Sequence, residues 1–322
     1  MCNKKITTIL ILIFLTAVNS YAAFMDAGHS ARAMGMGGAF TAVSDDGNAP
    51  LWNTAGPATA EELSLNFTHS KLFTGLDGVD LSQNYFSFIF PTAGIRRLMN
   101  FGTFAVSWTN MSARDLYSED AIMFSYALKL NRYLDAGAGL KYLSRTYTLD
   151  KYSEHYSTFE ESSSATDLSA DAGIMFRPSG NMDEGLRIGL SAQNIIPADI
   201  GIDEEEIVAP VYKAGVSYKL PPLRMLNSIR LSGGYVTFDM SYRDQDWGEE
   251  KHKINTNFGL ETNFLQDTLS LRCGVNMDEA ALGAGYKTEI EGISTGFNYA
   301  FTLPFNVRDS YGTHRFSVST SF

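Results

Sequence analysis

One short motif in the sequence has the spacing of a hydrolase nucleophile. The run Gly292-Ile293-Ser294-Thr295-Gly296 fits the pattern G-x-S-x-G, in which the serine occupies a sharp turn between a strand and a helix. Here the flanking residues keep alternating between apolar and polar side chains, as they do in one continuous strand. We therefore expect Ser294 on the polar face of a strand and not at a catalytic turn.

The residues that bind metals are scattered along the chain. The five histidines are His29, His69, His155, His252 and His314. None of them has the ligand spacing of a zinc site. We therefore expect no enzyme activity, no metal site and no cofactor.

A glycine-rich stretch, ARAMGMGGAF at positions 31–40, has the composition of a phosphate-binding loop. A dinucleotide or phosphate site would need a preceding strand and a following helix, or a Lys-Ser/Thr pair, and the sequence has none of these. A flexible linker is the second alternative, but Met34, Met36, Phe40 and Trp52 make the region apolar. The third is a compact plug made of small side chains.

A run of four acids, residues 203–206, is the strongest local concentration of charge. It could bind divalent cations at a cell surface, but such runs are more often solvated loops. Net charge is −11 over the whole chain, which disfavours a nucleic-acid partner.

The beginning of the chain indicates export. Lys4 and Lys5 precede an apolar run that is followed by small residues near Ala23, the pattern of a secretory signal peptide. We expect residues 1–22 to be removed. Cys2 leaves with them, so that Cys273 is the one cysteine of the mature chain and no intramolecular disulfide can form.

Side chains alternate with a period of two from about residue 61 to the end. In the last residues, for example, Phe316, Val318 and Phe322 share one face and Arg315 and Ser317 the other. This pattern predicts about fourteen strands, many of them near the ~9 to 11 residues that a tilted transmembrane strand needs. The expected strands are 61–73, 80–90, 99–110, 118–130, 134–148, 165–176, 185–196, 210–220, 226–238, 252–264, 268–276, 279–289, 292–303 and 312–322.

The fold class we predict is all-β: a transmembrane antiparallel β-barrel over 61–322. Strands can cross a bilayer only as a closed barrel, because an open edge would leave backbone groups without hydrogen bonds. An even strand number would place both termini in the periplasm, with the long connections 149–164, 197–209 and 239–251 on the outside of the cell. A secreted periplasmic β-sandwich is the alternative, but it would have shorter strands.

The opening region resembles a known group of proteins. The string A-R-A-M-G-M-G-G-A-F-T-A-V-S-D-D, followed by L-W-N-T-A-G, is similar to the amino-terminal region of the FadL/PorV superfamily of outer-membrane barrels. The resemblance implies a fourteen-stranded barrel whose amino-terminal segment, here residues 23–60, folds inside it as a hatch. The matching positions are Gly35, Gly37, Gly38, Trp52, Asn53, Ala55 and Gly56. Thr54 departs from the pattern, since the superfamily has proline there.

Two functions are compatible with this resemblance. The first is a FadL-like passive channel for hydrophobic or amphipathic small molecules, in which Lys141, Arg187, Lys213 and Lys219 would face the lumen and attract an anionic head group. The second is a PorV-like component that serves protein secretion by binding or shuttling cargo. The expected partners are accordingly outer-membrane lipid and either a hydrophobic small-molecule ligand or a secretion-system or cargo protein.

Overall fold

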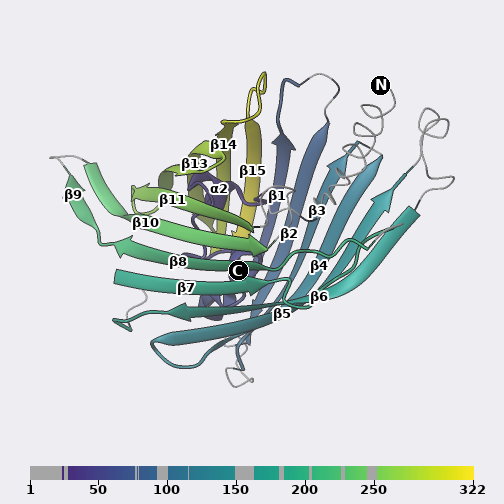
Figure 1. Ribbon diagram of the computed structural model, residues 1–322. Coiled ribbons are helices and arrows are strands. Elements are labelled where there is room, and N and C mark those ends of the chain that lie inside the picture. The colour runs from purple at the N-terminus through teal and green to yellow at the C-terminus, as the bar shows by residue number, and fades with distance from the viewer. Residues whose placement is uncertain are drawn as a thin grey trace, which may run out of the picture.

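The computed structural model is a closed antiparallel barrel of fourteen strands (Figure 1). It describes residues 24, 28–76, 78, 80–92, 101–114, 116–148, 163–180, 185–202, 205–225, 229–244 and 252–322. The signal peptide expected at 1–22 therefore lies outside the described residues. Within them, no helix is both long and apolar enough to cross a membrane.

The strands follow one another around the barrel in chain order. They are β1 (Ser64–Leu72), β2 (Leu81–Pro91), β3 (Thr103–Ala113), β4 (Tyr117–Lys129), β5 (Leu134–Tyr147), β6 (Ser163–Phe176), β7 (Gly185–Gln193), β8 (Val211–Leu220), β10 (Ile229–Asp244), β11 (His252–Phe264), β12 (Leu269–Asn276), β13 (Glu279–Ile290), β14 (Ile293–Pro304) and β15 (Thr313–Ser321). A three-residue strand, β9 (Leu223–Met225), pairs with β10 beside this ring.

The barrel closes between its first and last strands. Ser64 at the start of β1 pairs with Ser321 at the end of β15, so both strands meet at one rim, which we call the C-terminal rim. The opposite end, where β1 finishes at Leu72 and pairs with Leu81, is called the far rim. Every strand of the ring pairs with two neighbours, although β6 and β7 pair only between Ala172–Phe176 and Ile188–Ala192.

The outer face of the wall is apolar, as the alternation predicted. Phe124, Leu140, Leu168 and Leu282 are each at least 60% exposed, at 62%, 65%, 60% and 62%. Their neighbours in sequence turn inward, for example Ser125 and Ser169, which are buried. A surface of this kind suits contact with lipid and would be costly in water.

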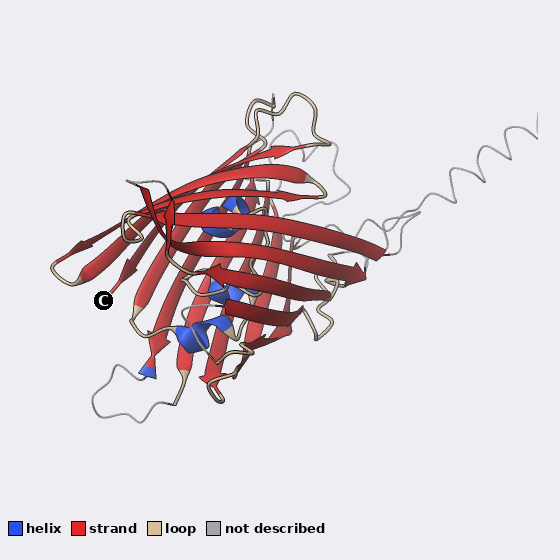
Figure 2. Cartoon of the chain, turned by 90° about the vertical axis from the view of Figure 1, so that its left-hand side faces the viewer, coloured by secondary structure: helices blue, strands red, loops and turns tan. Residues whose placement is uncertain are grey.

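Residues 28–60 lie inside the barrel and are called the inner segment. It contains three short helices, α2 (Ala31–Gly35), α3 (Ala49–Trp52) and the 3₁₀ helix η1 (Gly56–Thr59). Figure 2 shows these helices enclosed by the strands. The helix α2 packs against β12 to β15, and η1 against β2 to β5, so the segment reaches across the lumen from one wall to the other.

One strand differs clearly from the sequence-based prediction. The strand expected at 226–238 continues to Asp244, which shortens the long connection predicted at 239–251. In the inner segment, α2 ends at Gly35, and Gly37 and Gly38 follow with positive φ values of 64° and 79°.

Candidate functional site

A network of buried charges joins the inner segment to the barrel wall. The guanidinium of Arg32, in α2, donates from Nε and Nη2 to the carboxylate of Glu261 on β11, at 2.8 and 2.9 Å. Its Nη1 reaches Asp45 at 2.8 Å and Asp46 at 3.0 Å. Arg272 on β12 donates to the same Glu261 at 2.5 Å. One arginine therefore binds both a remote part of its own segment and the wall.

Asp45 is held from several directions at once. Besides Arg32, it accepts a hydrogen bond from the hydroxyl of Tyr235 at 2.5 Å and lies 3.5 Å from Arg187. Burial alone would raise the pKa of Asp45, but the attraction of Arg32 and Arg187 outweighs it and lowers the pKa to about 2. Burial alone would lower the pKa of Arg32, but the negative charges of Glu261, Asp45 and Asp46 outweigh it and raise this pKa. Both groups are therefore charged at neutral pH.

A second anchor holds the backbone of the inner segment. The carboxylate of Asp239 on β10 accepts hydrogen bonds from the backbone N–H groups of Phe40 and Thr41, at 2.8 and 2.7 Å. Next to it, the hydroxyl of Ser217 donates to the carbonyl of Ala42 at 3.1 Å. These bonds satisfy backbone groups that have no helical partner, which favours this one position of the chain.

The wall has glycines where it approaches the inner segment most closely. A methyl group built on Gly274 would lie 2.2 Å from the backbone nitrogen of Gly37, and one built on Gly189 would lie 2.3 Å from the carbonyl oxygen of Thr41. Similar close approaches to the inner segment occur at Gly137, Gly173, Gly259 and Gly283. The wall and the segment therefore meet backbone to backbone, which excludes any larger residue at these positions.

The residues of the opening motif take part in this docking. Asn53 donates from Nδ2 to the carbonyls of Thr41 and Ile174, both at 3.1 Å, and accepts from the backbone of Ala55 at 3.0 Å. Thr54, where proline was expected, donates to the carbonyl of Gly137 on β5 at 3.1 Å. The hydroxyl thus supplies a wall contact that proline lacks.

The other motif positions are all in or near the core of the inner segment. Trp52 is 4% exposed and its ring packs edge-on against Phe40. Gly35 lies next to Gly283, and a methyl group on Gly56 would lie 2.2 Å from the carbonyl oxygen of Ser44.

The four basic residues suggested from the sequence occupy different parts of the lumen. Lys141 contacts Asn194 at 2.8 Å and Asp171 at 2.9 Å. Arg187 and Lys219 lie over the ring of Tyr235, at 5.3 and 6.0 Å from its centre. Lys213 lies 4.8 Å from the centre of the Trp52 ring. They do not form one cluster, and Arg187 and Lys213 contact the inner segment itself.

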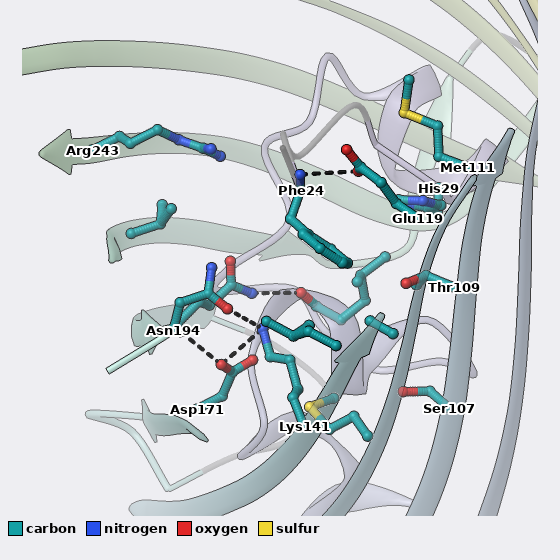
Figure 3. A pocket seen from close by; sticks show the side chains of 16 residues that line it. Phe24, His29, Ser107, Thr109, Met111, Glu119, Lys141, Asp171, Asn194 and Arg243 are labelled. Carbon is teal, nitrogen blue, oxygen red and sulfur yellow. Dashed lines mark hydrogen bonds and ion pairs between the residues drawn. The ribbon is translucent and has the colours of Figure 1, made fainter. Parts of the chain in front are cut away.

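A cavity of about 80 Å³ lies on the far-rim side of the inner segment (Figure 3). Its apolar lining includes Phe24, Leu51, Met111, Met123 and Leu143. Polar groups face it too: the backbone N–H of Phe24 donates to Glu119 at 2.9 Å, and Lys141 and Asp171 lie opposite.

The described parts of the connection between β7 and β8, 194–202 and 205–210, fold inward beside this cavity. Its residues Ala198, Ile200 and Val208 are buried against Leu143 on β5. Glu206 at its end pairs with Arg145. The acidic run was expected to be a solvated loop or a cation-binding surface; its Glu206 instead forms an ion pair with a residue of the wall. Residues 203–204 of the run lie outside the described residues.

The serine of the G-x-S-x-G motif does not lie at a turn between a strand and a helix. Ser294 is part of the regular strand β14 and pairs with Glu289 and Ser321. Among the described residues, no three His, Cys, Asp or Glu side chains are grouped to hold a metal ion.

The family described as "Type IX secretion system membrane protein PorP/SprF" matches residues 48–320. The chain belongs to this family. It is accordingly an outer-membrane barrel, and the relatives that match it are transport or secretion components. No curated protein matches the chain.

Solved structures with the same fold include hydrophobic channels. A FadL homologue from Pseudomonas aeruginosa superposes with a TM-score of 0.57 and 12% identity, over 90% of this chain and 97% of that one. The monoaromatic hydrocarbon channel CymD superposes with a TM-score of 0.52 and 11% identity, over 93% of this chain and 98% of that one. A deltaS2 mutant of the monoaromatic hydrocarbon channel TodX superposes with a TM-score of 0.55 and 10% identity, over 92% of this chain and 98% of that one. At these identities the likeness concerns the fold alone. The predicted FadL/PorV-like barrel is confirmed.

Proposed function

We propose that this protein is a non-enzymatic component of type IX secretion in the outer membrane, and that its inner segment is a hatch that stays in place. The observation that carries the proposal is the tie between Arg32 and Glu261, together with the anchor at Asp239. Removing one partner of a buried ion pair costs about 3–5 kcal/mol. A hatch held by several such contacts is poorly suited to open each time a solute passes.

The lengths of the two longest connections support one orientation in the membrane. The two longest connections, 148–162 and 194–210, lie at the far rim, which also has the short turns 114–116 and 277–278. The C-terminal rim has the short turns 130–133, 265–268 and 291–292 and the longer connections 92–102 and 177–184. In outer-membrane barrels the short turns face the periplasm. We therefore place the C terminus in the periplasm and the far rim at the cell surface, after removal of residues 1–22.

The position of Phe24 bears on the N terminus, which the sequence predicted to be periplasmic. Phe24 lies in the cavity on the far-rim side of the hatch, bonded to Glu119. This argues against a periplasmic N terminus, and we propose instead that the mature chain begins inside the lumen.

A cell lacking this protein tests the secretion role directly. We expect proteins that use the type IX system to be missing from the cell surface or unprocessed, and the uptake of monoaromatic hydrocarbons and fatty acids to be unchanged. The opposite pattern, normal secretion with lost uptake, would contradict the proposal and favour the channel.

A hydrophobic ligand in the lumen is a second candidate function. The observation that favours it is the cavity between Phe24, Leu51, Met111 and Leu143, because ligand pockets combine apolar walls with a few polar groups. Mass spectrometry of small molecules that co-purify with the protein in detergent, compared with a variant lacking residues 24–57, tests it. A defined ligand present with the full chain and absent with the variant would support this candidate; no ligand in either would refute it.

A further inference from the structure

The far-rim part of β6 has a neighbouring strand on one side only. With β5, β6 pairs along its whole length. On the other side, β7 pairs only with residues 172–176, and one more backbone bond joins Ile195 to the carbonyl of Ala170 at 2.8 Å. Figure 1 shows β6 continuing beyond the end of β7. Within the described part of the chain, residues 164–168 therefore form a strand edge without a partner strand, which we call the open edge.

The open edge presents backbone groups that take part in no sheet. Ala170 turns its carbonyl to this side, and residues two apart in a strand turn their N–H and C=O groups the same way. The backbone groups of Ser164, Thr166 and Leu168 therefore point there as well. The N–H of Leu168 is used locally, since it donates to Oδ1 of Asp167 at 2.7 Å. The remaining groups are a template on which another strand can form.

This part of β6 extends beyond the apolar band of the wall. One row of outward side chains across β4, β5 and β6 consists of the exposed residues Ile122, Tyr142 and Leu168. The next two rows toward the far rim are polar: Asp120, Ser144 and Thr166, followed by Ser118, Thr146 and Ser164. A change from apolar to polar side chains on the outer face marks the boundary of the membrane. Most of the open edge is therefore in water, where a peptide can reach it.

The side chains around the open edge are acidic on one face and apolar on the other. Asp167, on the lumen side, accepts the backbone N–H of Asp199 at 2.7 Å, so that two carboxylates lie near each other. Their partners in the described chain are backbone N–H groups and no cation. On the outer side, Leu168, Ile195 and Ile196 are 60%, 43% and 49% exposed. A strand added here would gain from a basic side chain opposite Asp167 and from apolar side chains on its outer face.

We propose that the open edge of β6 binds an extended basic segment of another polypeptide, which adds a strand where β7 is missing. Hydrogen bonds between the two main chains provide the affinity, and the alternating side chains provide the specificity. The pattern that fits is lysine or arginine toward the lumen, beside Asp167, alternating with valine or a similar residue toward Leu168. A second copy of this chain fits less well, because its own open edge carries the same acidic group.

The inference does not depend on the secretion role, since it follows from the strand register and from the charges at the edge. If the proposed function holds, the bound segment belongs to a secreted protein at the cell surface. Peptide binding is measured on the purified protein and secretion in the cell, so that one result can fail while the other stands.

The test uses a fluorescein-labelled peptide of alternating valine and lysine residues. It is added to the full mature chain in detergent, and saturable binding is expected by fluorescence anisotropy. The same peptide with N-methyl groups on the backbone nitrogens that face the edge keeps its side chains but loses these donors. It should bind at least about tenfold more weakly. A peptide with glutamate in place of lysine should bind about two- to fivefold more weakly.

One substitution in the protein locates the binding. Thr166→Pro removes an N–H that points to the open edge and leaves the bonds to β5 in place, which an edge strand tolerates. It should weaken binding of the valine–lysine peptide about tenfold. The matched control is Thr166→Val, which keeps the N–H and should bind the peptide as the unaltered protein does.

Circular dichroism checks that both variants are folded. If Thr166→Pro does not fold, the comparison with the N-methylated peptide decides. The proposal would be overturned by no saturable binding, by equal binding of the N-methylated peptide, or by equal binding to a folded Thr166→Pro variant. A dimer of the protein that excludes the peptide would overturn it too.

Discussion

Replacing Arg32 with methionine should loosen the hatch while the barrel stays intact. Arg32 contacts Glu261, Asp45 and Asp46 at 2.8 to 3.0 Å, and methionine keeps much of its apolar stem but none of its charge. Glu261 would still have Arg272. We therefore take the low end of the cost of breaking a buried ion pair, about 3 kcal/mol. That corresponds to an increase on the order of a hundredfold in the population of undocked hatch.

Native-state hydrogen exchange of the hatch amides measures this population. The informative amides include those of Gly38 and Ser44, which bond to Ala33 and Phe40 at 2.9 and 3.0 Å. They should exchange on the order of a hundredfold faster in Arg32→Met, whereas amides of the barrel strands should not change. The control is a change to methionine at the exposed Arg132 in the 130–133 turn. If the hatch amides exchange equally fast in both variants, the ion network does not hold the hatch and the reasoning is refuted.

Three further predictions concern the same hatch. Gly274→Ala should displace it and speed exchange at Gly37, because the added methyl group would lie 2.2 Å from that backbone nitrogen; Gly296→Ala, on β14, is the control. Acid should weaken docking: Asp45 has a pKa of about 2 in the fold against about 3.9 when unfolded. Its stabilisation of about 2 kcal/mol is complete above pH ~4 to 5 and is lost as the pH falls through about 2. Hydrogen exchange of the hatch amides, measured as a function of pH, should show this loss of stability. Asp45→Asn should show a weaker dependence on pH. Asn53→Ala should destabilise the docked hatch by about 2–3 kcal/mol, since two carbonyls and one N–H lose their partner, and an undiminished melting temperature would contradict this.

The strands of this protein could be predicted closely from the sequence. Most expected ranges differ from the observed ones by three residues or fewer at each end, as at β5 and β11. The reason is physical: a wall with lipid on one side and a polar lumen on the other requires alternation along every strand. The two exceptions are β3, which begins four residues later than expected, and β10, which runs on to Asp244. The end of β10 was missed because its polar far-rim residues resemble a loop.

The contacts inside the lumen were much harder to foresee. Arg32, Asp239 and Glu261 were not singled out, because each is an ordinary polar residue at a position where polarity was expected. These residues matter because they contact one another although they lie about 200 positions apart in the sequence. No local pattern encodes such contacts. The glycines on the lumen side of the strands were the available signal, since a glycine within a strand often marks the close approach of another backbone.

The most direct test of a fixed hatch is to lock it covalently and ask whether the protein still works in the cell. Ala31 and Ser317 are suitable positions, because the backbone nitrogen of Ala31 lies 3.2 Å from Oγ of Ser317. A variant with cysteines at both positions and with Cys273→Ser should form a disulfide between hatch and β15. We expect the oxidised variant to restore the secretion of type IX substrates as fully as the unaltered protein. Loss of secretion in the oxidised form, recovered on reduction, would contradict it and show that the hatch must move.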